Sequence, residues 1–283
     1  MRNYDFLIIG SNGLLGSSIV KILKKKKNTF LTIARKNSNF NLDLKDFNKL
    51  KKFFLKNRFK IVINCAGKID INFCEKKFND SLIINSTLVK FLSKMSKIYN
   101  FKFVQISTDH VYKGKRLKLN SETSKILAIN KYAKTKIIAE KYLKNLKNFL
   151  IIRTNFTGKK KNTFIDWLVK SIKSKKTIYL FNDMYTSTLD VKTCAKIIIE
   201  LALLKSKGIY NLGTRNMLSK EKFAVNLSKI LKRRLEYKSV SCDMQQISRG
   251  KNLGLNVKKI EKKMGFRMLT AQQSIVNLAK EYK

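Results

Sequence analysis

The first half of the chain alternates short apolar runs with longer amphipathic stretches. Short apolar runs of the kind that form buried strands cover residues 4–9, 30–34, 61–65, 101–107 and 149–153. Stretches with apolar residues at helical spacing cover 14–25, 44–55, 75–99 (as one helix or two) and 130–146. The apolar runs lack polar alternation, which indicates strands covered by helices on both faces. This order predicts an α/β fold with a doubly wound parallel sheet.

The rhythm changes after residue 153. Helical patterns at 163–174, 191–204, 219–231, 257–264 and 271–280 are joined by short strands at 178–181 and 208–212. We therefore expect a first domain at residues 1–155 and a smaller, mostly helical second domain at 156–283. Residues 184–212 are expected to return to the first domain.

A turn with three glycines follows the first strand and opens the first helix. It runs Gly10-Ser11-Asn12-Gly13-Leu14-Leu15-Gly16. Glycines let the backbone turn sharply and approach a pyrophosphate, whose charge the helix N-terminus stabilises. A strand before it, a helix after it and a second strand about twenty residues on are the context of a dinucleotide-binding Rossmann fold. A glycine-rich turn that binds no ligand is the alternative.

The end of the second strand carries basic residues. Arg35 and Lys36 follow Ala34, where a fold that prefers NAD would place Asp or Glu on the ribose 2′-hydroxyl. A guanidinium and an ammonium would attract a 2′-phosphate, so the sequence favours NADP(H), with NADH as the alternative. Further on, Asp43-Leu44 is a second candidate contact. Asp43 would accept a hydrogen bond from the adenine amino group or serve as a plain helix N-cap.

Candidate acid–base chemistry lies between the fourth strand and the next helix. Tyr132 and Lys136 are four residues apart and share one helix face, so the ammonium can lie beside the phenol. A free tyrosine has a pKa near 10, and a neighbouring cation lowers it, which makes Tyr132 a candidate general acid or base. Thr108 ends a sheet strand and is a candidate to hydrogen-bond a reacting carbonyl oxygen. A chance pair in so lysine-rich a chain is the alternative.

Charge and composition exclude other classes. The net charge is +44, but only ten of the 62 basic residues are arginine, and the lysines are spread over every segment. A sequence-specific nucleic-acid binder would cluster its charge and use arginine for base contacts, so we expect only salt-dependent, non-specific binding to polyanions. Four cysteines without a CxxC pair and a single histidine predict buried thiols and no zinc site, and they leave a metal at a subunit contact open. No apolar run reaches the ~18 residues of a membrane span. A cytoplasmic protein is therefore the expectation.

Further motifs resemble the extended short-chain dehydrogenases/reductases, and most closely the dTDP-4-dehydrorhamnose reductase branch. Asn64-Cys65-Ala66-Gly67 resembles the family's Asn-Ala-Ala motif, whose backbone lies against the cofactor, and Asn85 matches the Asn of the following helix. Residues 107–114 are similar to its Ser-Thr-Asp-Tyr-Val-Phe-x-Gly, and residues 130–140 to its Asn-x-Tyr-Gly-x-x-Lys-x-x-x-Glu. Residues 208–213, 218–224 and 252–256 are similar to its second half.

The resemblance implies a nucleotide-sugar reductase of polysaccharide biosynthesis. NADP(H) would reduce the 4-keto group of a nucleotide-linked 6-deoxysugar, with Tyr132 as proton donor, Lys136 on the cofactor ribose and Thr108 on the carbonyl. Further cofactor contacts are implied for Cys65, Ala66, Gly67 and Asn85. Substrate contacts are expected from Lys68, Thr108, Asp109, Val111 and Arg153. The expected partner is the nucleotide sugar, and the oligomeric state is open, a homodimer included.

Two other interpretations and several departures stand beside this one. An epimerase or dehydratase of the same superfamily would keep its cofactor bound and recycle it, and a non-catalytic nucleotide-binding scaffold would need no Tyr132–Lys136 pair. With no proline in the chain, Ser187-Thr188-Leu189 replaces the family's Ser-Pro-Thr and Arg249-Gly250 its Arg-Pro. His110 stands where Tyr is usual, and we expect it to pack or hydrogen-bond rather than catalyse. Lys68 replaces an aromatic residue or Leu, which leaves the sugar's identity open.

Overall fold

Strands and helices alternate through the first half of the chain in the computed structural model, which describes residues 2–114, 117–161 and 163–282. The elements up to residue 154 are β1 (Arg2–Ile9), α1 (Leu14–Lys25), β2 (Phe30–Ala34), β3 (Phe40–Asn41), α2 (Phe47–Lys56), β4 (Asn57–Asn64), α3 (Ile71–Lys76), α4 (Phe78–Leu82), the π-helix η1 (Ile83–Thr87), α5 (Leu88–Tyr99), β5 (Lys102–Thr108), the 3₁₀ turn η2 (Asp109–Val111), α6 (Lys131–Leu143) and β6 (Phe149–Thr154).

Shorter strands and further helices follow. They are β7 (Phe156–Thr157), α7 (Phe164–Lys173), β8 (Ile178–Phe181), β9 (Tyr185–Thr186), β10 (Leu189–Asp190), α8 (Val191–Leu203), β11 (Gly208–Leu212), β12 (Leu218–Ser219), α9 (Lys220–Ile230), β13 (Tyr237–Val240), the 3₁₀ turn η3 (Cys242–Met244), β14 (Asn252–Leu253), α10 (Lys258–Met264) and α11 (Ala271–Ala279).

The chain divides into two compact units. Unit 1 comprises Met1–Ser107, Asn130–Ile152 and Ala195–Ile209. Unit 2 comprises Thr108–Ile129, Arg153–Cys194 and Tyr210–Lys283. Residues 108–129 therefore group with the second half of the chain, and 195–209 group with the first.

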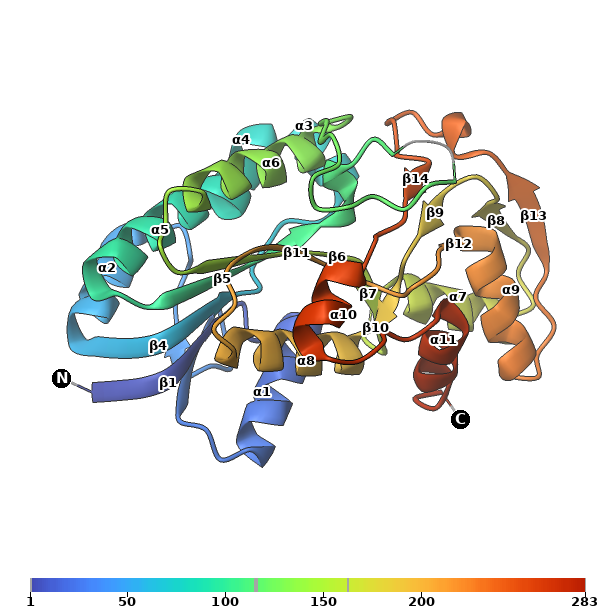
Figure 1. The fold of residues 1–283 in the computed structure, drawn as a ribbon. Coiled ribbons are helices and arrows are strands. Elements are labelled where there is room, and N and C mark those ends of the chain that lie inside the picture. Colours follow the sequence, from blue (N-terminus) through green and yellow to red (C-terminus); the bar gives the residue numbers. More distant parts are fainter. Residues whose placement is uncertain (1, 115–116, 162, 283) are drawn as a thin grey trace. The chain divides into compact units, whose positions relative to one another are not determined.

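The central sheet has seven strands in the order β11-β6-β5-β4-β1-β2-β3, and the five strands from β5 to β3 pair in parallel. The strand order reverses between β1 and β4, which is where doubly wound sheets bind ligands. Helices α2, α5 and α6 lie on one face of the sheet, and α1 and α8 lie on the other (Figure 1). The predicted doubly wound Rossmann fold is confirmed.

Side-chain caps explain where the second helix begins. The predicted bounds of α1 and β2 are confirmed, but α2 begins at Phe47 rather than at residue 44. Asp46 is its N-cap, because Oδ1 of Asp46 accepts a hydrogen bond from Lys49 N at 2.9 Å. The alternative of Asp43 as the N-cap is therefore wrong. Asp43 Oδ1 instead accepts from Lys45 N at 3.0 Å in the preceding turn.

Residues 71–99 form four short elements rather than the predicted one or two helices. The first, α3, begins at Ile71 because Asp70 Oδ1 accepts from Phe73 N at 3.0 Å. Between α4 and α5, the π-helical turn η1 carries Asn85. Turns of this kind occur frequently at functional sites. The apolar spacing continues through all four elements, so the pattern alone does not register the breaks between them.

An apolar core between the sheet and its helices holds unit 1 together. Leu7, Ile33 and Val62 from the strands are fully buried beside Phe54 of α2 and Phe103 of β5. Burying a side chain of this size contributes roughly 1.5–3 kcal/mol. The core therefore fixes the strands whose carboxyl ends carry the candidate site.

Unit 2 combines helices with short ladders of strands. Its ladders are β10-β7, β12-β9-β14 and β13-β8. Its core packs Ile165 and Leu168 of α7 against Phe223 of α9 and Ile275 of α11. The predicted helices and β8 are present, whereas the two-residue strands escape sequence analysis because so short a strand carries no periodic signal. None of the described helices is long and apolar enough to cross a membrane.

Candidate functional site

The glycine turn after β1 packs tightly against the loop after β4. Gly10 has a φ of 77°, and a Cβ there would lie 2.7 Å from the backbone N of Ala66. A Cβ at Gly16 would lie 2.3 Å from the carbonyl oxygen of Gly10. A side chain at either position would push α1 or the Ala66 loop away from the strand ends.

The N-terminus of α1 lies at this turn without a side-chain cap. Gly13 is the N-cap residue, and the first turn of the helix holds no acidic residue. Ser11 Oγ is buried and has no hydrogen-bond partner among the residues that the structure describes. Open backbone N–H groups at a helix N-terminus, beside a buried hydroxyl, fit an anionic group such as a pyrophosphate.

Basic residues lie beside the glycine turn. The side-chain amide of Asn12 donates a hydrogen bond to the carbonyl oxygen of Lys36, which fastens the end of β2 to the turn. Arg35 and Lys36 are both exposed there. Leu44 is buried, whereas Asp43 is exposed, and contacts of either residue with an adenine stay a prediction.

Asn85 clamps the loop that follows β4. Its Oδ1 accepts from Lys68 N at 2.7 Å, and its Nδ2 donates to Lys68 O at 2.9 Å and to Thr135 Oγ1 at 3.0 Å. The Asn85 side chain is buried, so it fixes residues 65–67 and the start of the next segment against α6. The Lys68 ammonium lies 4.9 Å from the ring centroid of Phe73.

The Tyr132–Lys136 pair is buried on α6. Asn130 starts the helix, because its Oδ1 accepts from Ala133 N at 2.9 Å. Tyr132 is 8% exposed and Lys136 is 5% exposed. Nζ of Lys136 donates to the carbonyl oxygen of Ile106 in β5 at 2.7 Å. The carbonyl holds the amine beside the carboxyl end of the sheet.

The surroundings of Lys136 connect it to the glycine turn. Burial lowers the pKa of Lys136 to about 8, and the Glu140 carboxylate and Cys65 oppose that shift. Cys65 in turn lies against the turn, since a Cβ at Gly10 would lie 3.0 Å from the Cys65 carbonyl carbon. The structure therefore brings the two predicted features, the glycine turn and the Lys136 amine, into one corner of unit 1.

A buried carboxylate lies one helical turn beyond Lys136. Glu140 is 1% exposed, and its Oε1 accepts a hydrogen bond from Ser107 Oγ at 2.6 Å. Both residues belong to motifs that sequence analysis singled out without assigning them a role. Their contact joins α6 to the end of β5.

Thr108 and the turn after it begin unit 2. Thr108 Oγ1 donates to Asp109 Oδ1 at 3.2 Å and accepts from His110 N at 3.2 Å. The other carboxylate oxygen of Asp109 accepts from Asn155 Nδ2 at 2.8 Å. Asp109 is almost fully buried. The network orients both residues, and the role of the His110 side chain stays a prediction.

Two cations to which sequence analysis gave no role act electrostatically on this turn. Burial lowers the pKa of His110; Asp109 opposes the shift, and Lys220 and Arg249 reinforce it. Burial also lowers the pKa of Lys220. Arg249 Nε is buried without a hydrogen-bond partner among the described residues. Spacing gave no signal because these cations lie more than a hundred residues from Asp109. Only their segments' likeness to the reductase family pointed to them.

Two predicted substrate contacts are engaged inside unit 2. Nη1 of Arg153 donates to Tyr112 Oη at 2.8 Å and to Glu122 O at 3.0 Å. Val111 is fully buried. Burial raises the pKa of Tyr112 to about 12 although Arg153 opposes the shift, so this phenol stays protonated. The roles of Arg153 and Val111 toward a substrate stay predictions.

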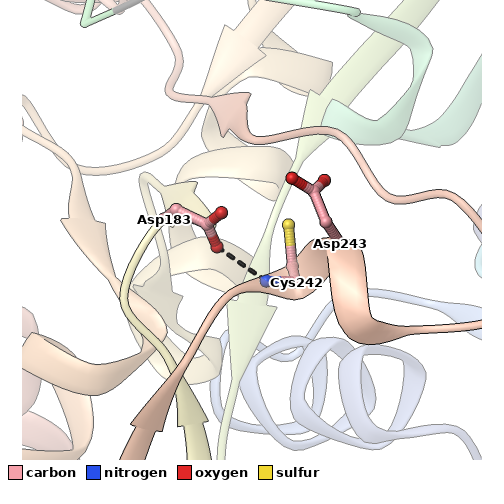
Figure 2. A group of neighbouring side chains, drawn as sticks. All are labelled: Asp183, Cys242 and Asp243. Atoms are coloured by element: carbon pink, nitrogen blue, oxygen red, sulfur yellow. Dashed lines mark hydrogen bonds between the residues drawn. The ribbon is translucent and has the colours of Figure 1, made fainter.

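An acidic cluster elsewhere in unit 2 has the donor atoms of a cation site. Ligand atoms of Asp183, Cys242 and Asp243 lie within 4.8 Å of one another, and Cys242 N donates to Asp183 Oδ1 at 2.8 Å (Figure 2). The Lys251 ammonium lies 3.2 Å from Asp183 Oδ2 and also contacts Asp243. Burial raises the pKa of the Cys242 thiol to about 11. Lys251 therefore supplies the cation that these carboxylates need, and the cluster joins the loop after β8 to η3.

Known proteins resemble this chain over most of its length. The spore coat polysaccharide biosynthesis protein SpsK of Bacillus subtilis (strain 168) is 25% identical over 220 residues, which are 77% of this chain and 76% of that protein. The dTDP-4-dehydrorhamnose reductase of Salmonella typhimurium is 26% identical over 215 residues, 74% of this chain and 72% of the reductase.

Solved structures and a family profile extend this likeness to the whole chain. The crystal structure of dTDP-4-dehydrorhamnose reductase from Bacillus anthracis, in complex with NADP, has a TM-score of 0.91 at 22% identity and covers 99% of each chain. At that identity the likeness shows a shared fold. The profile of the family described as RmlD substrate binding domain matches residues 4–283. The chain therefore belongs to the RmlD substrate-binding-domain family.

Proposed function

We propose that this protein is a reductase that uses NADP(H) to reduce the 4-keto group of a nucleotide-linked 6-deoxysugar. The observation that carries the proposal is the buried Tyr132–Lys136 pair, whose amine shares a corner of unit 1 with the glycine turn. Family membership supports it, because the relatives include dTDP-4-dehydrorhamnose reductases. A non-catalytic scaffold would have no use for a buried phenol and a buried amine at this place.

The residues of unit 1 fit NADP(H). The uncapped N-terminus of α1 and the buried Ser11 Oγ would take the pyrophosphate. Arg35 and Lys36, which Asn12 fastens beside the turn, would attract a 2′-phosphate. The Bacillus anthracis relative was crystallised with NADP, which supports this choice over NADH. The bound cofactor supplies the hydride.

Three side chains would manage the proton and the carbonyl. Tyr132 would donate its proton to the substrate oxygen as negative charge develops there. Lys136 would stabilise the phenolate that Tyr132 leaves behind, because the Ile106 carbonyl holds the ammonium on the same helix face. Thr108 would hydrogen-bond the carbonyl oxygen, with its hydroxyl oriented by Asp109.

The cations of unit 2 would attract the substrate's diphosphate. Lys220 and Arg249 bring two positive charges to a turn whose carboxylate is Asp109. Partly buried charges of this kind favour an anionic ligand.

The proposal is tested by Tyr132→Phe with a thymidine diphosphate-linked 4-keto-6-deoxysugar and NADPH. We expect kcat to fall by about 10²–10⁴-fold, the usual contribution of a positioned general acid. NADPH binding should remain within about twofold, because the phenol makes only part of the cofactor contacts. Loss of NADPH absorbance measures turnover, and NADPH fluorescence measures binding.

Tyr142→Phe on the same helix is the matched control. Tyr142 lies six residues beyond Lys136, and its ring centroid lies 5.6 Å from the Lys90 ammonium instead. It should turn over like the wild type. Near-normal turnover of Tyr132→Phe would contradict the acid role. Conversion of a nucleotide sugar without any added NADPH would indicate an epimerase or dehydratase instead.

A further inference from the structure

We propose that Glu140 is a positioning residue that keeps Lys136 in its cationic form and, through Ser107, ties α6 to the end of β5. The proposal rests on the proposed function, because it assigns Glu140 a task through the Tyr132–Lys136 pair. Glu140 itself is not expected to touch substrate or cofactor.

Helical spacing aligns three groups on one face of α6. Tyr132, Lys136 and Glu140 follow one another at intervals of four residues, so each lies one turn beyond the last. All three side chains are buried, and Glu140 is the most buried of them at 1% exposed. Burying a carboxylate costs free energy unless it is paired. The burial of Glu140 one helical turn from the Lys136 ammonium therefore calls for an explanation.

Two hydrogen bonds connect Glu140 and Lys136 of α6 to the strand β5. Ser107 Oγ donates to Glu140 Oε1 at 2.6 Å, while Lys136 Nζ donates to Ile106 O at 2.7 Å. The two bonds join α6 to consecutive residues of β5, one donated by the strand and one by the helix. The contact therefore fixes the register between helix and strand immediately before Thr108.

Among the residues that the structure describes, few charges act on Lys136, and Glu140 is the main one. On its own helix Glu140 opposes the deprotonation that burial favours, and at the end of β4 Cys65 acts in the same direction. The strand offers only the neutral Ile106 carbonyl. From η1, Ser86 Oγ donates to Thr135 O and brings no charge. Burial lowers the pKa of Lys136 to about 8 even with Glu140 in place.

Removing the charge of Glu140 should therefore release the proton of Lys136 at lower pH. Tyr132 and Lys136 share one face of α6, and the reductive step of the proposed function needs both protons present. Whichever of these two protons is lost at the lower pH sets the alkaline limb of the kcat profile, where kcat falls as the pH rises. A purely structural Glu140 would leave that limb where it is.

The decisive variant is Glu140→Gln, which keeps the shape and an oxygen for Ser107 but removes the charge. We expect the alkaline limb of kcat to move down by about one pH unit. That shift corresponds to about a fivefold lower kcat at pH 8 and a value within about twofold of the wild type near pH 6.5. Glu140→Asp retains the charge, and its limb should lie near that of the wild type.

A second readout needs no substrate. Trace labelling of the full-length protein with isotopic acetic anhydride, followed by peptide mass spectrometry, gives the pH at which the Lys136 amine becomes reactive. In Glu140→Gln this onset should fall by the same pH interval as the rate limb. Glu75→Gln is the matched control: Glu75 accepts from Lys131 N at 2.6 Å at the start of the same helix but does not act on Lys136. Its labelling curve should not move.

Ser107→Ala separates charge from hydrogen bonding. It removes the donor to Glu140 and leaves the carboxylate, so its alkaline limb should move much less than that of Glu140→Gln. An equal shift in both variants, or an unchanged labelling curve in Glu140→Gln, would overturn the proposal. If the labelling curve moves as expected but no 4-keto nucleotide sugar is reduced by the wild type, the proposed function fails while the charge relation between Glu140 and Lys136 stands.

Discussion

Two buried lysines place their ammonium groups at opposite ends of β5, and the two groups have different hydrogen-bond partners. Lys102, the first residue of the strand, is 7% exposed and donates to the carbonyl oxygens of Ala202 at 2.8 Å and Leu204 at 2.6 Å, at the end of α8. Lys136 is 5% exposed and donates to the single carbonyl of Ile106. Both lie in unit 1: Lys102 belongs to β5, whereas Lys136 belongs to α6 and contacts β5 through its side chain.

The difference shows that the partners, and not the degree of burial, decide what a buried amine does. Carbonyls at a helix C-terminus carry partial negative charge and lack intrahelical donors. The Lys102 ammonium supplies the hydrogen-bond donors that these carbonyls need. Lys136 has one neutral acceptor and a carboxylate a turn away, which leaves its proton loosely held. The first arrangement stabilises the fold, and the second fits the role proposed for Lys136.

The largest expected effect on stability follows from removing the first lysine. Lys102→Met leaves carbonyls of α8 buried without a donor, and we expect the free energy of unfolding to fall by about 4 kcal/mol. Chemical denaturation measures the loss. Turnover per folded molecule should be unchanged, because Lys102 lies at the opposite end of β5 from Thr108.

Lys97→Met provides the control for this variant. Lys97 lies in the last turn of helix α5, near the carbonyl end of that helix, but it is exposed. Its loss should cost no more than about 1 kcal/mol. Equal destabilisation by both variants would mean that burial of the Lys102 amine adds nothing to its contribution to the free energy of unfolding.

Sequence analysis predicted the parts of unit 1 that depend on local signals. The bounds of α1 and β2 follow from apolar spacing and from the glycine turn, and the Tyr132–Lys136 pair follows from helical spacing. The start of α2 was missed because two aspartates, Asp43 and Asp46, compete as caps three residues apart. Only the backbone around them shows which one accepts from the helix.

The polar contacts inside unit 2 could not be predicted in this way. Arg153 has the chemistry of a substrate-binding residue, and nothing in its neighbours along the chain shows that Tyr112 and Glu122 engage it. The approach of Lys220 to Asp109 joins segments more than a hundred residues apart. Residue type reveals what a side chain can do, whereas its partner depends on the tertiary fold.

The second lysine should instead make stability depend on pH. Lys136 has a pKa of about 8 in the folded protein against 10.5 for a free lysine. Between these values the unfolded chain holds a proton that the folded protein has released, so the free energy of unfolding rises with pH. We expect the wild type to gain about 3 kcal/mol relative to Lys136→Met between pH 7 and pH 10.5.

Denaturation at several pH values measures this gain, and Lys141→Met serves as the control. Lys141 is exposed on the same helix, so its variant should follow the wild type across the whole range. Parallel curves for Lys136→Met and the wild type would show that Lys136 has the same pKa in the folded protein as in the unfolded chain. Lys102 and Lys136 would then differ only in the number of carbonyl oxygens that their ammonium groups contact.

The smallest expected effect concerns the start of the helix that carries Lys136. Asn130→Ala removes the acceptor for Ala133 N, and loss of such a cap costs about 1 kcal/mol. Tyr132 is the second residue of α6, so fraying of the first turn should also lower kcat by a few-fold, while Lys102 and its carbonyls stay in place. Asn130→Asp keeps the acceptor and should restore both values, as denaturation and NADPH turnover would measure. If Asn130→Ala lowered stability without touching kcat, the first turn of α6 would not control the position of Tyr132, and the single carbonyl of Ile106 would suffice to hold the catalytic face.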